Sequence, residues 1–114
     1  MAASSQIPQL GPATALVQLL TENPTLPALS WRISASEFSA DTLHGSAPHT
    51  EDPRPVAAAW AAALGAEVSK KPFLYDGDVE YVEFAVVTVW RDVPVQIYTS
   101  CPVSLLTAKS AVAA

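Results

Sequence analysis

Residues 78–100, DVEYVEFAVVTVWRDVPVQIYTS, decide the fold of this chain. The stretch is rich in β-branched and aromatic residues, which favour extended strands. It is interrupted once, by Arg91-Asp92. A two-residue interruption between two such runs is typical of a β-hairpin. We therefore predict a long hairpin with strands at 79–90 and 93–100.

The turn also predicts the register of the hairpin, because it pairs Trp90 with Val93. Counting back along both strands then gathers apolar side chains on one face. The members of this face are Val82, Phe84, Val86, Trp90, Val93, Val95 and Ile97. Pro94 cannot donate a hydrogen bond to a ladder, so the 93–100 strand is expected either at an edge of the sheet or with its outer side free at Pro94.

The opposite face of the hairpin is predicted to be apolar as well. It carries Tyr81, Ala85, Val87, Val89 and Tyr98. A sheet that is apolar on both sides needs cover on both sides. Either the helices divide between the faces, or one face is an interface with another molecule. The candidate interface residues are Tyr81, Val87, Val89, Val95 and Tyr98.

One helix and two short strands are predicted before residue 50. Pro12 suits the first position of a helix, and Asn23-Pro24 ends it. Residues 29–35 alternate apolar and polar side chains, which is typical of a half-buried strand. A weaker strand is expected near 41–46.

A second helix is predicted over residues 53–64. Asp52-Pro53 is a suitable start, with Thr50 as an alternative cap. Gly65 suits the left-handed residue that follows a helix. The predicted core stripe of this helix is Val56, Trp60, Ala63 and Leu64.

A third strand, at 67–75, leads into the hairpin through the turn signal Asp76-Gly77. A two-residue turn there pairs Tyr75 with Asp78. The same register places Lys70 opposite Glu83, as a cross-strand ion pair.

Together these elements predict an α+β fold in one domain, in the order α-β-β-α-β-β-β, with a mainly antiparallel sheet packed against helices. The chain has 114 residues, enough to bury one core without disulfides or metal. We expect a flexible leader at 1–10, the domain at 11–102, and a tail or short helix at 103–114.

The charge of the chain disfavours nucleic acid as a partner. The net charge is −5, and the six basic residues are scattered. Binding to phosphate backbones needs clustered Lys and Arg. With one cysteine, no signal-peptide pattern and no run long enough to span a membrane, we expect a cytoplasmic protein.

No catalytic motif and no cofactor-binding motif is recognisable. His44, His49 and Asp41 are weak metal-ligand candidates, but their spacing matches no standard zinc pattern, so no metal is expected. Cys101 would need a nearby base to act as a nucleophile. His44 or His49 would have to supply that base, and a packed structural thiol is the preferred interpretation.

Three segments resemble parts of known proteins: NPTLPALSW at 23–31, DPRPVAAAWAAALG at 52–65, and VWRDVPVQIY at 89–98. Together they are similar to small actinobacterial proteins without an assigned function, including some carried by phages and mobile elements. The resemblance covers most of residues 20–100. It implies a fold and no activity for any residue.

Three functions are compatible with these features. The first is a non-enzymatic protein-binding or self-associating module, either a homodimer or the accessory partner of another protein. The second is a small-molecule or metal binder, or a minor enzyme, that uses the His and Asp residues of the 41–52 loop with Cys101. The third is an acidic inhibitor or immunity-type protein that covers a basic site.

Overall fold

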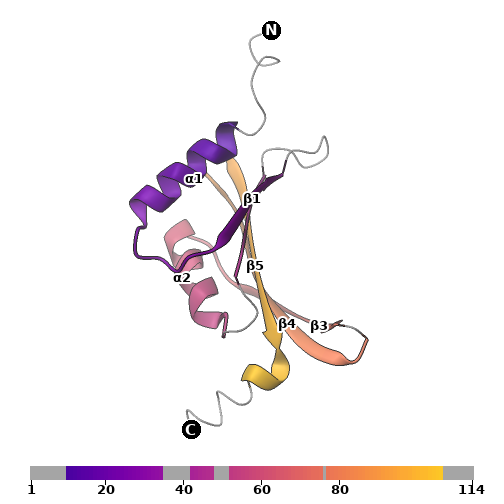
Figure 1. The fold of residues 1–114 in the computed structure, drawn as a ribbon. Helices are drawn as coiled ribbons and strands as arrows, with labels where there is room; N and C mark the ends of the chain where they lie inside the picture. Colours follow the sequence, from indigo (N-terminus) through magenta and orange to yellow (C-terminus); the bar gives the residue numbers. More distant parts are fainter. Residues whose placement is uncertain (1–9, 35–41, 48–51, 76, 107–114) are drawn as a thin grey trace.

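The computed structural model describes residues 10–34, 42–47, 52–75 and 77–106 (Figure 1). It contains helices α1 (Leu10–Glu22) and α2 (Arg54–Leu64), and residues 103–106 form a short helical turn. The strands are β1 (Ser30–Ser34), β2 (Thr42–Ser46), β3 (Ser69–Tyr75), β4 (Val79–Trp90) and β5 (Val93–Pro102). The predicted α+β class and element order are confirmed. Of the predicted leader, only Leu10 is described, and it begins α1; most of the predicted tail lies outside the described residues.

The five strands form one sheet in the order β1-β2-β5-β4-β3. All neighbours are antiparallel except β2 and β5, which run parallel. The mainly antiparallel sheet is therefore confirmed. Of the two alternatives for 93–100, the edge strand is wrong, because β5 lies between β4 and β2. The pairing of β2 with β5 begins at Val95, so Pro94 lies just before it.

The pairing pattern explains how Pro94 fits into a central strand. A two-residue turn makes the closing pair, Trp90 and Val93, a hydrogen-bonded pair. The next pair, Val89 and Pro94, is then of the non-hydrogen-bonded kind. The nitrogen of Pro94 faces away from β4, one residue before the segment 95–98 that pairs with β2. The missing N–H of Pro94 therefore costs β5 no backbone hydrogen bond to β4.

The predicted register of the β4–β5 hairpin is confirmed, with Trp90 paired to Val93. The β3–β4 register differs from the prediction by one residue. Tyr75 pairs with Val79, so the connection has one residue more than a two-residue turn, and Gly77 adopts φ 81° within it. Lys71 therefore lies opposite Glu83, in place of Lys70.

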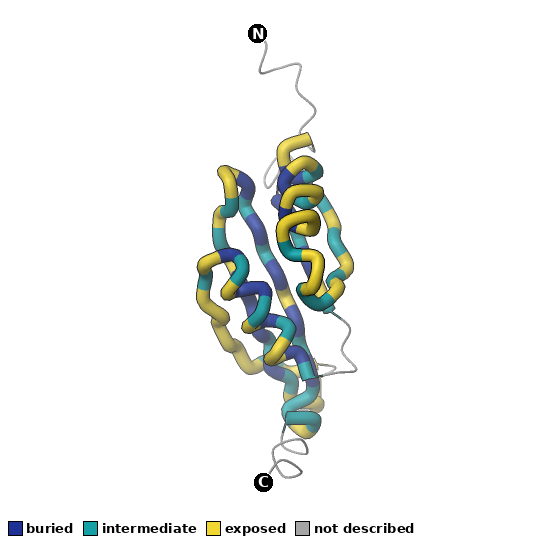
Figure 2. The backbone as a smooth tube through the Cα atoms, turned by 90° about the vertical axis from the view of Figure 1, so that its left-hand side faces the viewer, coloured by how far each residue is buried: buried dark blue, intermediate teal, exposed yellow. Residues whose placement is uncertain are grey.

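Both helices pack on the same face of the sheet. Leu19 of α1 and Trp60 of α2 share a core cluster with Val86 of β4 and Ile97 of β5. Viewed from this side, the helices lie in front of the buried segments of the strands (Figure 2). A second cluster on this face joins α2 to the turn at 103–106. The two helices do not divide between the faces.

Helix α2 begins and ends close to the predicted positions. Gly65 is left-handed, with φ 67° and ψ 34°, as expected for the residue after a helix. Asp52 accepts the N–H of Arg54 at 3.0 Å. The buried stripe differs in part from the prediction and consists of Ala57, Trp60, Ala61 and Leu64. The small alanines allow the helix to lie close to the sheet.

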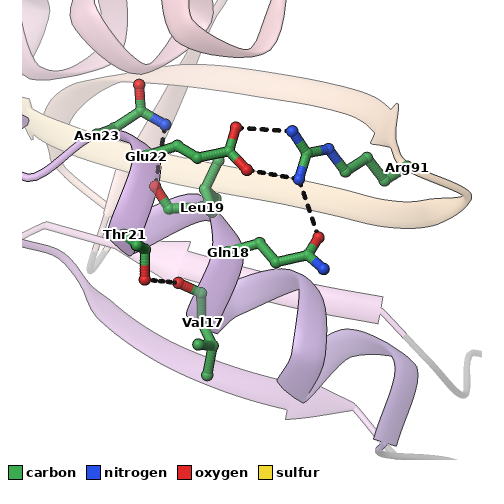
Figure 3. Close-up of polar contacts among 7 residues, drawn as sticks. All are labelled: Val17, Gln18, Leu19, Thr21, Glu22, Asn23 and Arg91. Carbon is green, nitrogen blue, oxygen red and sulfur yellow. Dashed lines mark hydrogen bonds and ion pairs between the residues drawn. The ribbon is translucent and has the colours of Figure 1, made fainter.

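The C-terminal half of α1 is tied to the β4–β5 turn (Figure 3). The guanidinium of Arg91 donates to both carboxylate oxygens of Glu22, each at 2.6 Å, and to Oε1 of Gln18 at 3.0 Å. The amide of Asn23 donates to the carbonyl of Leu19 at 2.9 Å, which satisfies one carbonyl near the helix end. The contacts of Arg91 join segments about 70 residues apart in the sequence.

Candidate functional site

The face of the sheet opposite the helices is the candidate interaction surface, and we call it the outer face. Side chains alternate along a strand, so Val82, Phe84 and Val86 point to the helices and the residues between them point away. Four of the five candidate interface residues lie on the outer face: Tyr81, Val87, Val89 and Tyr98. No described helix covers them.

The fifth candidate, Val95, is not on the outer face. It is fully buried against α1 and α2, in the same cluster as Val86 and Ile97. The assignment followed from the edge position expected for 93–100. Because β5 is central and Val95 is a core residue, it has no surface to offer a partner.

The centre of the outer face is exposed and mainly apolar, with Gln96 as the polar residue opposite Val87. Val87 and Val89 are 57% and 65% exposed, and Tyr98 on the neighbouring strand is 37% exposed. Ala85, which lies opposite Tyr98, is by contrast buried. Single exposed apolar residues are common on monomers, but neighbouring ones on one face of a sheet form a patch that favours association.

An aromatic cluster occupies the end of the outer face near the β3–β4 turn. The ring of Tyr81 lies 5.6 Å from that of Phe73 and 5.2 Å from that of Tyr75. These distances are typical of stabilising aromatic pairs. Tyr81 is therefore partly covered by residues of β3, whereas Tyr75 stays exposed.

A shallow pocket of about 310 Å³ lies beside the apolar centre. Its lining residues are Ser30, Trp31, Arg32, His44, Gly45, Ser46 and Tyr98. Arg32 and His44 are cross-strand neighbours on β1 and β2. Burial lowers the pKa of His44, and the charge of Arg32 lowers it further, so the imidazole is neutral at pH 7.

The weak metal-ligand candidates are not assembled in the described part of the chain. His44 lies within β2, not in a loop as expected. Asp41 and His49 lie outside the described residues. Residues 10–34, 42–47, 52–75 and 77–106 contain no group of three or more His, Cys, Asp or Glu that could hold a metal ion.

Cys101 is a buried thiol on the helix side of β5. It packs with Ala57, Val82 and Phe84. Burial raises its pKa, and the nearby carboxylate of Asp52 raises it further, which disfavours the reactive thiolate. Since His44 lies on the outer face, the sheet separates these two groups.

One feature of the surface was missed by sequence reasoning. The 86–90 segment of β4 has β5 on one side and none of the described strands on the other, because β3 begins at Ser69, opposite Ala85. The unequal lengths of the two strands indicate this open stretch. A 12-residue strand is longer than the 7-residue strand that pairs with it, so part of its edge stays open.

Comparison of the chain with protein-family models, curated proteins and solved structures found no match. The resemblance to small actinobacterial proteins therefore stays a prediction. In the part of the chain that the structure describes, no helix combines the length and apolar character needed to cross a membrane.

Proposed function

We propose that this protein is a non-enzymatic binding module that associates through the outer face of its sheet. The single observation that carries the proposal is the position of α1 and α2, which both cover the other face. This arrangement leaves Val87, Val89 and Tyr98 exposed beside one another. Burial of apolar surface is the main driving force of protein association.

Two properties of the site favour binding over catalysis. Its exposed centre is built from valine side chains, which offer no acid, base or nucleophile. Cys101 and His44, the candidate nucleophile and the one candidate base that the structure describes, lie on opposite faces of the sheet. The geometry therefore supports a surface that is covered by another protein molecule.

The proposal is tested with Val89→Lys and a matched control, Val17→Lys. Both valines are 65% exposed, but Val17 lies on α1 and Val89 on the outer face. We expect the wild-type protein, purified untagged from its host, to show a native mass above the 12.0 kDa of one chain. Val89→Lys should reduce this mass to that of one chain, and Val17→Lys should leave it unchanged.

The contrary result is equally clear. Association that survives Val89→Lys, in a variant that keeps the wild-type unfolding midpoint, excludes the outer face as the interface. Loss of association in both variants points to a general effect of added charge. A wild-type protein that elutes alone at every concentration, with no captured protein, overturns the proposed function.

A second candidate function is the binding of a small anion in the pocket beside Arg32 and His44. Arg32 supplies a permanent positive charge, and His44 lies beside it as a neutral donor or acceptor. Titration of the protein with inorganic phosphate should then shift the NMR signals of His44 and Ser46. Unchanged signals at millimolar phosphate would exclude this candidate.

The third function considered, an acidic inhibitor, rests on the net charge of −5 alone. Such a protein associates faster at low salt because the partner is attracted from a distance. The apolar outer face predicts the opposite behaviour, an association that changes little with salt. Measuring the native mass at low and high salt therefore separates the two proposals.

A further inference from the structure

Arg32 on β1 differs from the other two arginines of the chain in its surroundings. The guanidinium of Arg54 pairs with the carboxylate of Asp52 at 2.6 Å. That of Arg91 pairs with the carboxylate of Glu22, also at 2.6 Å. Arg32 makes no ion pair in the part of the chain that the structure describes. A guanidinium that no carboxylate neutralises can bind an anion from outside the molecule.

Arg32 and His44 lie together at a hollow of the outer face. They are directly opposite each other on β1 and β2, so their side chains lie on the same side of the sheet. Both line the pocket of about 310 Å³, together with the hydroxyl-bearing residues Ser30, Ser46 and Tyr98. Guanidinium, imidazole and hydroxyl groups are the donors that proteins offer to the oxygens of an oxyanion.

The groups that surround His44 determine its charge. The other titratable residues that line the pocket are Arg32 and Tyr98, and no carboxylate is among them. On β5, His44 is paired with Gln96, which carries no charge. β2 contains no further titratable residue, and the helices pack on the other face of the sheet. Burial lowers the pKa of His44, and the charge of Arg32 lowers it further.

We propose that this pocket binds an oxyanion together with a proton, with Arg32 holding the anion and His44 receiving the proton from solvent. The inference rests on the second candidate function, anion binding in the pocket, and adds how that binding is regulated. An anion on the guanidinium offsets the positive charge that opposes protonation of the imidazole. The protonated ring has two N–H donors, and its positive charge attracts the anion in turn.

The coupling between anion and proton acts in both directions. If the bound anion raises the pKa of His44, protonation of His44 must raise the affinity for the anion by the same factor. A pKa that is one unit higher with the anion bound corresponds to about tenfold tighter binding by the protonated protein. The affinity should therefore rise as the pH falls through the pKa of the anion-bound histidine, and level off below that of the anion-free one.

Sulfate is the probe for this coupling, because it stays a dianion across the pH range in which histidine titrates. The pKa of His44 is measured by NMR in sulfate and in sodium chloride of equal ionic strength. The chain has two histidines, so His44→Gln assigns the signal. We expect a higher pKa in sulfate. The dissociation constant of sulfate should be roughly tenfold lower at about pH 5 than at about pH 7.5.

Three variants separate the roles of the two residues. Arg32→Gln should abolish sulfate binding and, without sulfate, raise the pKa of His44, because a nearby positive charge is removed. His44→Gln should leave weak sulfate binding that no longer depends on pH. The matched control, Lys71→Gln, removes a positive charge from the same face, on β3 opposite Glu83. It should change neither the affinity for sulfate nor the pKa of His44.

The outcomes distinguish this inference from the candidate function on which it rests. If neither sulfate nor phosphate binds at any pH in this range, both are wrong. If sulfate binds equally well at both pH values and leaves the pKa of His44 unchanged, the pocket is an anion site without proton coupling, and only this inference is wrong. Sulfate binding that survives Arg32→Gln, or that Lys71→Gln weakens equally, reveals a non-specific charge effect and overturns both.

Discussion

The indole N–H of Trp60 donates a hydrogen bond to the carbonyl of Pro27, 2.9 Å away. This bond joins α2 to the connection between α1 and β1, two segments separated by 33 residues. Trp60 is 1% exposed and also meets the ring of Trp31 edge to face, with the centroids 5.4 Å apart. One side chain therefore ties α2 to the connection that follows α1 and to β1.

Replacing Trp60 with Phe should lower the free energy of unfolding by about 1–3 kcal/mol, because the Pro27 carbonyl loses its donor in a part-buried place. Urea denaturation measures this loss. Trp31→Phe is the control, since the Trp31 indole N–H makes no hydrogen bond within the described part of the chain. An equal loss in both variants would show that ring volume, not the hydrogen bond, matters at Trp60.

Gly45 should tolerate no side chain, because a Cβ there would lie 2.9 Å from the ring of Trp31. Gly45→Ala is expected to displace that ring and to destabilise the protein by about 1–3 kcal/mol. At Gly11, in α1, a Cβ meets nothing within 4 Å. Gly11→Ala should therefore be neutral or stabilise by up to about 1 kcal/mol. Thermal unfolding measures both effects. The midpoint should fall for Gly45→Ala and should stay the same or rise for Gly11→Ala.

The β4–β5 turn holds two non-glycine residues at positive φ, Arg91 at 50° and Asp92 at 68°. This backbone conformation suits a hairpin turn, but a residue with a Cβ adopts it only at a cost in free energy. Asp92→Gly should stabilise the protein by about 0.5–1 kcal/mol. The reverse change at a similar φ, Gly65→Ala at 67°, should cost about 1 kcal/mol. Chemical denaturation of both variants compares the two; a destabilised Asp92→Gly would contradict this account.

His44 should make stability depend on pH. Its pKa is lowered in the folded protein by burial and by the charge of Arg32, whereas the imidazole of the unfolded chain keeps a pKa of about 6.5. Below that pH the unfolded state binds more protons, so stability falls as the pH drops through about 6.5 toward the folded pKa. His44→Asn should remove this part of the pH dependence. The free energy of unfolding of both proteins, measured between about pH 5 and 7.5, shows this difference in pH dependence. The same pH dependence in both proteins would refute the prediction.

Much of the fold was predictable because it depends on neighbours in the sequence. The turn at Arg91-Asp92 aligns the residues on either side of it, which made the β4–β5 register and its two faces accessible. Gly65 marked the end of α2 in the same local way. The β3–β4 register was missed by one residue, because Asp76-Gly77 resembles a two-residue turn and the actual connection is longer.

The candidate surface was predictable only in part. Alternation along β4 and β5 placed Tyr81, Val87, Val89 and Tyr98 opposite the core, as the structure confirms. Val95 was misplaced because Pro94 suggested an edge, although a proline between hydrogen-bonded pairs is compatible with a central strand. No local pattern distinguishes these two situations.

The sequence by itself determined which residues form helices, strands and turns, and which side of each strand is apolar, since side-chain alternation and turn geometry act over a few residues. Only the tertiary structure decided that β2 joins β5 in parallel and that both helices share one face. Strand order and helix placement depend on contacts between distant segments. They follow from the burial of the whole core rather than from any short run of residues.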